Sequence, residues 1–409
     1  MRKSLGLVLV TLLVVFSFSC LGAQAKDDPI IIGVPTMMTG SGAAQGQDIM
    51  EGAIMAVEDI NNMYGGIFGR PLKVQFADVG EGRPDVVASA AEELDRAGAV
   101  FFTPGAFLGP SNVHVFGTYE QPYIHTTTWR EAVEAYLSDP DEYSNVFMLT
   151  PDEWTYGPEA FKGMTEYIDY DHPNNKIAAV ATELSYNMTV QATALEEARK
   201  AGWEVVLDDV APVGSTDYSS QLARIRKEKP SIVMCNITTV DEGVAFMNQF
   251  LEDPTPSLVY IHFIPSMPEF RALLGDNANG LFWQTCVATI PSPEATEWEA
   301  RYLEKFGREP GAYAAWEYDS IFMWRQAVLD VGSVDDYAAL NNWFETLSDH
   351  PFKGLCANYH LNPERHEGIL GPDKVPMHWF QIQDGKNVLL SLSGAQFGDN
   401  EFQVPHWIK

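Results

Sequence analysis

Short apolar segments alternate with amphipathic segments over most of this 409-residue chain, and this alternation restricts its fold more than any other feature. The apolar segments are rich in Val, Ile and Phe, as buried strands are. The amphipathic segments carry apolar residues at the three- and four-residue spacing of one helix face. Strands that alternate with helices form parallel sheets, which bind ligands beyond the carboxyl ends of their strands. We therefore expect an α/β protein with doubly wound, Rossmann-like sheets.

The first strand–helix unit, residues 30–61, presents a glycine-containing loop between its strand and its helix. Asp48 and Glu51 have the spacing of a capping box, which predicts that the helix begins near Asp48. The free N–H groups of such a helix end could hold a polar or anionic group. Gln45 stands where the dinucleotide fingerprint requires its third glycine, so a nucleotide cofactor is not indicated.

The strand–helix alternation occurs in two blocks of similar size, at residues 30–126 and 158–263. Two further helices follow within residues 294–331 without strands between them, so they need an existing sheet to pack on. The last segment, residues 350–409, is rich in turns and prolines and contains two short strands. We expect two lobes, with this segment as a tail that covers one of them.

The N-terminus has the features of a secretory signal. Residues 1–25 combine two basic residues, an apolar core too short to span a bilayer, and a small-x-small cleavage site. A lipid anchor at Cys20 is the competing interpretation, but the residues before Cys20 fit that motif poorly. We expect an exported chain that is soluble outside the cytoplasm. Its formal net charge of −30 makes nucleic acid a poor partner.

Three cysteines lie beyond the signal: Cys235, Cys286 and Cys356. In an oxidising compartment an odd count allows at most one disulfide. Cys235 ends an apolar strand as a buried thiol would, so we expect any disulfide to join Cys286 and Cys356. The cysteine and histidine spacings match no metal-binding pattern, and no metal site is predicted.

Five motifs occur in a fixed order along the chain. They read TGSGAAQGQDIMEGAIMAVEDIN and GGIFGRPLKV early in the chain, then SYNMTVQATALEEARKAGWEVV, GSTDYSSQLARIRKEKPSIVM and GAYAAWEYDSIFMWRQAV. Individually the motifs are degenerate, but together they span nearly the whole chain beyond the signal. Together they resemble the periplasmic solute-binding proteins of the branched-chain amino acid and amide class, which serve ABC importers.

The resemblance implies a type I periplasmic binding fold, in which two lobes are joined by three crossing strands and close on a ligand. Lobe one would comprise residues 27–147 and 288–348, and lobe two residues 148–287 and 349–409. The expected partners are a small-molecule ligand and the permease of an ABC importer. The chain would be a monomer without a cofactor and would perform no chemistry on its ligand.

The family's cleft positions can be transferred to this sequence one by one. In lobe one they fall on polar and aromatic residues that follow the strands and on one late aromatic residue; these are Gln45, Phe107, Leu108, Gly109, Thr127, Thr128, Trp129 and Tyr313. In lobe two they fall on Tyr186, Asn236, Thr238 and Phe263.

Two of these positions depart from the family pattern. Phe107 stands where relatives usually have a serine that holds the ligand carboxylate, and Phe263 stands where they have the acid that pairs with the α-ammonium. A buried ammonium without a carboxylate is costly, so Phe263 argues against a standard α-amino acid held in the usual way. An aromatic or short carboxylate, an amide, or a cation held by aromatic rings would fit.

Other functions stay open at this point. The same fold could act as a sensory module that reports ligand occupancy to a signalling partner, or it could bind a branched-chain amino acid in an altered mode. An exported enzyme is less favoured, because the chain has no nucleophile elbow, phosphate loop or zinc-protease motif.

Overall fold

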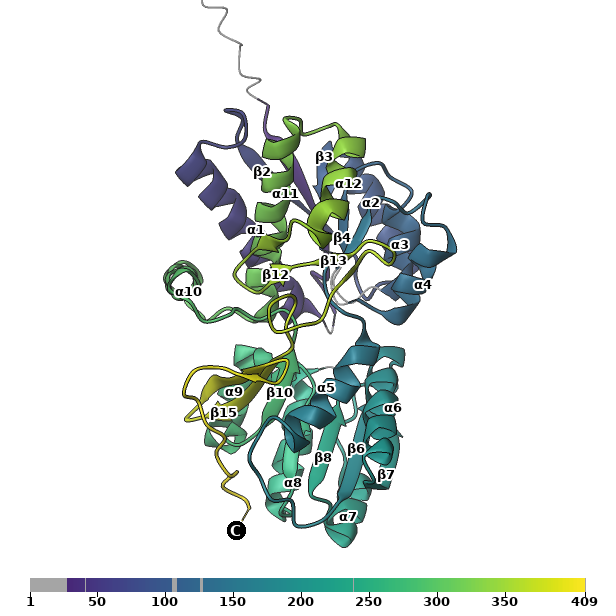
Figure 1. Cartoon of the computed structure of the whole chain (residues 1–409), viewed down its shortest axis with the longest axis vertical. Helices are drawn as coiled ribbons and strands as arrows, with labels where there is room; N and C mark the ends of the chain where they lie inside the picture. The colour runs from purple at the N-terminus through teal and green to yellow at the C-terminus, as the bar shows by residue number, and fades with distance from the viewer. Residues whose placement is uncertain (1–27, 41, 105–108, 126–127, 238, 409) are drawn as a thin grey trace, which may run out of the picture.

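Two lobes, each built on one β-sheet, are stacked along the long axis of the molecule (Figure 1). The structure is a computed structural model that describes residues 28–40, 42–104, 109–125, 128–237 and 239–408. The proposed signal segment and Cys20 lie outside these residues. In both lobes parallel strands alternate with helices, and the predicted α/β class is confirmed.

The sheet of the first lobe has the strand order β13, β14, β5, β4, β3, β1, β2. In chain order these strands are β1 (Ile30–Thr36), β2 (Leu72–Asp78), β3 (Ala99–Phe102), β4 (Tyr123–His125), β5 (Val146–Met148), β13 (Leu361–Asn362) and β14 (Glu367–Gly368). Its helices are α1 (Ala43–Tyr64), α2 (Pro84–Arg96), α3 (Gly109–Phe116), α4 (Arg130–Ser138), α10 (Pro293–Phe306), α11 (Ala312–Val331) and α12 (Tyr337–Glu345).

The sheet of the second lobe has the order β17, β16, β15, β10, β9, β8, β6, β7. Its strands are β6 (Lys176–Thr182), β7 (Glu204–Ala211), β8 (Ile232–Asn236), β9 (Leu258–Ile261), β10 (Phe282–Thr285), β15 (His378–Gln383), β16 (Lys386–Leu392) and β17 (Ala395–Gln396). The helices are α5 (Glu153–Thr165), α6 (Ser185–Lys200), α7 (Ser219–Glu228), α8 (Val240–Glu252) and α9 (Pro268–Leu274). A separate pair, β11 (Phe352–Lys353) and β12 (Asn358–Tyr359), completes the strands.

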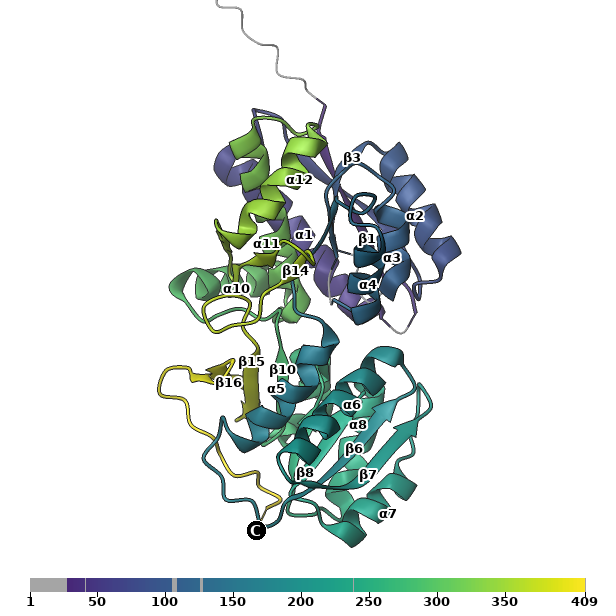
Figure 2. The same ribbon diagram turned by 45° about the vertical axis from the view of Figure 1, so that its right-hand side comes forward.

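The first sheet is covered on both faces, which explains why its central strands β1, β3, β4 and β5 are apolar without alternation (Figure 2). Neighbouring residues of β3 show this, because side chains of successive strand residues point to opposite faces. Phe101 stacks on Trp324 of α11 at 5.4 Å between ring centroids, whereas Phe102 packs against Phe116 of α3 at 5.1 Å. The core of the lobe therefore consists of two layers, one on each side of the sheet.

The chain passes between the lobes three times, after β5, after β10 and after β14. The third passage differs from the predicted boundary, which assigned all of residues 349–409 to lobe two. Instead, β13 and β14 extend the first sheet, where Glu367 pairs with Met148 of β5. Only from β15 onward does the tail join the second sheet.

The predicted start of α1 is wrong. The helix begins at Ala43, and Asp48 lies inside it with no solvent exposure. The Asp48 carboxylate accepts hydrogen bonds from the backbone N–H groups of Gly311 at 2.8 Å and Ala314 at 3.0 Å. These groups belong to the N-terminus of α11, so Asp48 caps a different helix from its own.

The predicted disulfide between Cys286 and Cys356 is not formed in the structure. Both residues, like Cys235, are buried free thiols. The Cys286 sulfur lies 3.7 Å from the sulfur of Met377, and the Cys356 sulfur lies 3.7 Å from the backbone oxygen of Val287. Burial raises the pKa of Cys286 to about 12, so this residue is an uncharged thiol at neutral pH.

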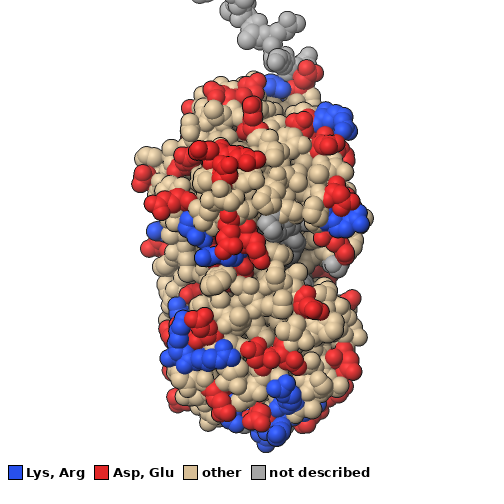
Figure 3. All heavy atoms as spheres, turned by 90° about the vertical axis from the view of Figure 1, so that its right-hand side faces the viewer, with Lys and Arg blue, Asp and Glu red and all other residues tan. Residues whose placement is uncertain are grey.

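Acidic side chains are spread over both lobes, with basic side chains among them, on the face shown in Figure 3. This agrees with the net charge of −30. Within the described parts of the chain, no helix is long and apolar enough to cross a membrane.

Candidate ligand-binding cleft

An aromatic cavity lies between the lobes, at the edge where the strands of both sheets end. Its walls come from segments that follow β4, β6, β8 and β9, from α5 and the start of α11, and from the end of β10 with the chain that leaves it. The described residues that line it are Trp129, Tyr156, Leu184, Tyr186, Asn187, Ile237, His262, Phe263, Ile264, Thr285, Val287 and Tyr313. The structure thus brings together four of the predicted ligand contacts: Trp129, Tyr186, Phe263 and Tyr313.

These four aromatic residues form two pairs, and each pair joins the lobes. Trp129 of the first lobe and Tyr186 of the second have ring centroids 5.7 Å apart, with the rings inclined by 46°. Tyr313 of the first lobe and Phe263 of the second are 5.0 Å apart, inclined by 47°. Tilted contacts of this kind are favourable beyond the area they bury. The rings therefore hold the lobes together across the cavity.

Three of the four aromatic rings belong to residues at the N-terminal ends of helices. Trp129 is the N-cap residue of α4, and Tyr186 and Tyr313 each lie in the first turn of a helix, α6 and α11. Phe263 instead sits between β9 and a short 3-10 turn with a φ of 59°, a left-handed conformation. A non-glycine residue in such a conformation costs roughly 1–3 kcal/mol, and such residues gather at ligand sites.

The described lining of the cavity contains no Asp, Glu, Lys or Arg. Its polar groups are mainly hydroxyls, the imidazole of His262 and the amide of Asn187. Burial lowers the pKa of His262 to about 3 and raises the pKa of Tyr186 well above 10, so both side chains are uncharged at neutral pH. The cavity itself measures about 30 Å³, and its lining is of a kind that contacts an apolar or aromatic group with a few hydrogen-bonding atoms.

Three predicted contacts lie elsewhere in the structure. Gln45 is a buried residue of α1, and Asn236 ends β8 with both side-chain polar atoms enclosed and without hydrogen-bond partners. Thr128 is bound to the crossing segment, because its hydroxyl donates to the backbone oxygen of Thr150 at 2.7 Å. None of the three lines the cavity.

The other predicted contacts cannot be placed against the cavity. Gly109 begins α3. Four predicted contacts lie outside the described residues: Phe107, Leu108, Thr127 and Thr238.

Sequence reasoning missed several lining residues, of which Tyr156 and His262 carry the most chemistry. The ring of His262 lies 5.4 Å from that of Tyr156 and 5.7 Å from that of Tyr186. A signal for His262 was present, because the tripeptide Tyr-Ile-His occurs twice, at residues 123–125 and 260–262. Both copies directly precede a segment whose residues were proposed as ligand contacts.

A polar cluster links the lobes at the first crossing. The Glu153 carboxylate at the start of α5 accepts a hydrogen bond from the backbone N–H of Arg130, at 2.6 Å. Burial raises the pKa of Glu153 to about 8. The neighbouring Asp152 pairs with Arg130 at 3.0 Å and with Arg365 at 3.4 Å. Charged groups of both lobes thus meet beside the cavity rather than inside it.

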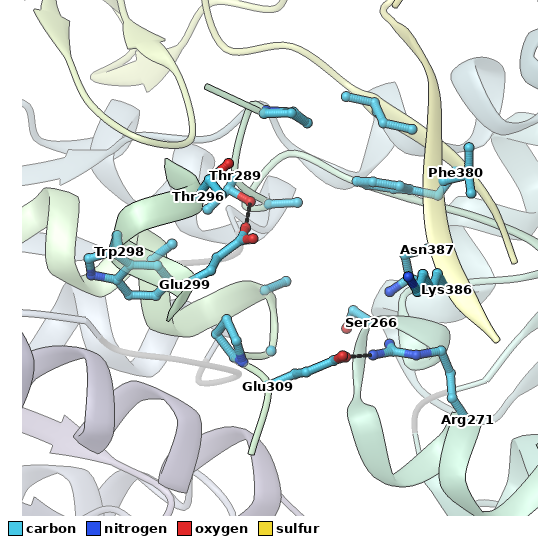
Figure 4. Close-up of a pocket in the computed structure, with 18 of the residues that line it drawn as sticks. Ser266, Arg271, Thr289, Thr296, Trp298, Glu299, Glu309, Phe380, Lys386 and Asn387 are labelled. Carbon is cyan, nitrogen blue, oxygen red and sulfur yellow. Dashed lines mark hydrogen bonds and ion pairs between the residues drawn. The ribbon is translucent and has the colours of Figure 1, made fainter. Parts of the chain in front are cut away.

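A second, larger groove of about 590 Å³ lies next to the crossing after β10 (Figure 4). Residues of this crossing line both spaces, since Val287 faces the aromatic cavity and Ala288 and Thr289 face the groove. Across the groove, Arg271 of α9 pairs with Glu309 of the first lobe at 2.6 Å. None of the predicted ligand contacts lines this groove, whereas four of them line the aromatic cavity. The aromatic cavity is therefore the candidate ligand site, although its volume is smaller than that of the groove.

Comparisons with known proteins agree with this architecture. A family model described as "Periplasmic binding protein" matches residues 29–386. Among curated proteins, the Leu/Ile/Val-binding protein homolog 3 of Brucella melitensis is 25% identical over 323 residues, covering 78% of this chain and 83% of the relative.

Two solved structures illustrate the similarity of fold. A putative branched-chain amino acid ABC transporter protein from Silicibacter pomeroyi superposes with a TM-score of 0.84 and 26% identity, covering 93% of this chain and 100% of the other. A solute-binding protein of an ABC transporter from R. palustris, solved in complex with benzoate, has a TM-score of 0.71 and 16% identity, covering 92% and 99%. At this low identity the second likeness concerns the fold.

Proposed function

Because the chain belongs to the periplasmic binding protein family, we propose that it captures a small organic molecule between its lobes and delivers it to the permease of an ABC importer. Rotation of the lobes about the three crossings would open and close the cavity. The chain acts outside the cytoplasm after removal of its N-terminal signal, and it releases the ligand unchanged.

We propose further that the ligand is an aromatic or short carboxylate, or an amide, rather than a standard α-amino acid. The observation that carries this proposal is the uncharged lining of the cavity, where Phe263 faces Tyr313 in the place that the family resemblance assigns to an acidic residue. An α-ammonium enclosed here would lose its water without gaining a carboxylate partner among the described lining residues. Apolar rings and branched hydrocarbon chains have no comparable desolvation cost when they are enclosed in the cavity.

The similar proteins are named for, or were solved with, ligands that carry an ammonium group and ligands that do not. The relative from Brucella melitensis is named for leucine, isoleucine and valine, whereas the protein from R. palustris was solved with benzoate. Isoleucine and benzoate are therefore the natural reference ligands for a test on this chain. They differ in that only isoleucine carries an ammonium group.

A thermal-unfolding screen of the purified mature protein tests the proposal, with benzoate, benzamide, isoleucine and 3-methyl-2-oxopentanoate as ligands. A ligand that binds only the folded form stabilises it by about 2.7 kcal/mol at a hundredfold excess over Kd. We expect stabilisation by at least one acid or amide that lacks an ammonium group, and little by isoleucine. Tight binding of isoleucine with none by the other three would refute the ligand class.

A pair of tryptophan variants tests whether the aromatic cavity is the site. Trp129→Ala removes a lining ring and should weaken binding of an aromatic acid by tenfold or more. Trp154→Ala is the matched control, because Trp154 is half exposed beneath the guanidinium of Arg130 and does not line the cavity. Equal affinities of the two variants would place the site elsewhere.

A further inference from the structure

A tyrosine–histidine pair occurs at the same place in both lobes. Tyr123 and His125 belong to β4, which lies between β5 and β3 in the first sheet. Tyr260 lies in β9, the corresponding strand of the second sheet, which runs between β10 and β8. His262 follows directly after the end of β9. In each pair the tyrosine hydroxyl lies 2.9 Å from Nδ1 of the histidine. In each lobe, the hydrogen bond at Nδ1 therefore holds the imidazole at the carboxyl end of the strand.

The hydrogen bonds around Tyr260 determine which nitrogen of His262 carries the proton. Gln284 donates from Nε2 to the backbone oxygen of Tyr156 at 2.6 Å, which fixes the orientation of its amide. The amide oxygen of Gln284 has no hydrogen-bond partner, so it does not accept a hydrogen bond from the Tyr260 hydroxyl. Within the described chain, the hydroxyl hydrogen of Tyr260 thus has one acceptor, Nδ1 of His262.

A neutral imidazole that accepts at Nδ1 carries its hydrogen on Nε2. The ring is neutral because burial lowers the pKa of His262 to about 3. His262 lines the aromatic cavity, and its Nε2 has no hydrogen-bond partner among the residues that the structure describes. The wall of the cavity therefore contains, directly before Phe263, an imidazole whose Nε2–H has no acceptor among the described residues.

We propose that His262 determines ligand specificity by donating a hydrogen bond from Nε2–H to an acceptor oxygen of the ligand, a ketone, amide or carboxylate oxygen. A donor at this place selects against a ligand that presents an ammonium group there, because two donors facing each other leave both unpaired. This inference rests on the proposed function and narrows it. The expected ligand combines an apolar ring or branched chain with an acceptor oxygen turned toward the second lobe.

The protonation state can be tested without any ligand. Two-bond ¹⁵N–¹H correlation spectra of the mature protein distinguish the two neutral tautomers of histidine, and His262→Gln identifies the signal of His262. We expect the Nε2–H form in the wild type and a mixture of both forms in Tyr260→Phe, which lacks the hydroxyl donor. An Nδ1–H ring in the wild type would overturn the inference and leave the proposed function untouched.

Ligand specificity is tested with two compounds that share one carbon skeleton. Isoleucine carries an ammonium group where 3-methyl-2-oxopentanoate carries a ketone oxygen. By isothermal titration calorimetry we expect the oxo acid to bind at least tenfold more tightly, because leaving the buried donor unpaired is costly. Preference for isoleucine would overturn the inference, whereas a complete lack of binding by all reference ligands would count against the proposed function itself.

Three substitutions of His262 separate the role of Nε2–H from mere packing. The amide nitrogen of His262→Gln reaches the position of Nε2, so this variant should bind the oxo acid within about threefold of the wild type. His262→Asn, whose amide reaches only the position of Nδ1, and His262→Leu should each lose tenfold or more. His406→Gln, at an exposed position outside the cavity, is the control. Equal affinities of the Gln and Asn variants would overturn the inference even if the Leu variant failed to fold.

Discussion

Phe263 of the second lobe and Tyr313 of the first face each other across the cavity, with ring centroids 5.0 Å apart. Both rings are nearly buried, at 8% and 2% exposure, although they come from segments 50 residues apart on different lobes. The contact exists only when the lobes approach each other. The candidate site therefore has an apolar contact between the lobes at the place where the family resemblance leads one to expect a carboxylate.

Replacing Phe263 with Glu should shift ligand preference toward amino acids. The new carboxylate would offer a partner to the ammonium of isoleucine and would repel benzoate. We expect the ratio of the two affinities, measured by calorimetry, to change by at least tenfold in favour of isoleucine. Phe263→Leu is the control, since it removes the ring and adds no charge.

If the Glu and Leu variants gave the same affinity ratio, Phe263 would not lie next to the ligand's polar end. Both replacements keep an unbranched Cβ at the left-handed backbone position of Phe263, so backbone strain is matched between them.

The alternation of strands and helices was readable from the sequence because each element carries its own periodicity. Helix α11 is one of the two helices predicted within residues 294–331, and the glycines at 311 and 332 mark its ends. The start of α1 was missed for a tertiary reason. Asp48 has the chemistry of a cap, but the N–H groups that it caps are 263 and 266 residues away in α11.

The site was predictable only in part. Trp129 and Tyr186, which line the cavity, could be proposed because they stand at positions that the family resemblance assigns to the cleft. Gln45 and Thr128 were proposed on the same basis, yet the structure places them outside the cavity lining. Which side of a loop faces the cleft depends on packing between lobes that local patterns do not encode. The role of His262 depends on the hydrogen bonds of Tyr260 and Gln284, which only the fold determines.

Stability should fall as the pH rises toward 8 because of Glu153. Its pKa is raised from 4.5 to about 8 by burial, so folding favours the protonated form. The stability that this proton contributes is complete below about pH 4.5 and is lost as the pH rises through about 8. Thermal unfolding between pH 7 and about pH 9 should show a steeper decline for the wild type than for Glu153→Gln.

The Gln variant keeps an oxygen that can accept the hydrogen bond from the N–H of Arg130, so it serves as its own structural control. Asp48 and Asp319, with pKa values raised to about 6, titrate below this window and act equally in both proteins. Parallel curves for the two proteins would show that Glu153 is already ionised in the folded state at pH 7.

The ion pair between Arg271 and Glu309 should favour the closed arrangement, because it joins the lobes beside the crossing after β10. Glu309 is largely exposed, so the pair is worth about 1 kcal/mol or less, which corresponds to about fivefold in affinity. We expect Glu309→Gln to weaken ligand binding by up to this factor at low salt and to have a smaller effect at high salt.

Glu304→Gln is the matched control for this variant. Glu304 is exposed on α10, and the substitution removes the same charge without touching a contact between the lobes. Equal affinities of the two variants at low salt would show that the ion pair does not contribute to closure.

The cysteines should behave as three protected thiols. Cys235, Cys286 and Cys356 are buried and free, and burial raises the pKa of each, so the reactive thiolate is scarce in the folded protein. We expect a thiol reagent to modify almost none of them in the native mature protein and all three after unfolding without a reductant. Modification of one thiol alone after unfolding would restore the disulfide that the sequence suggested, and Cys356→Ser, which leaves Cys286 without that partner, would then expose a second reactive thiol.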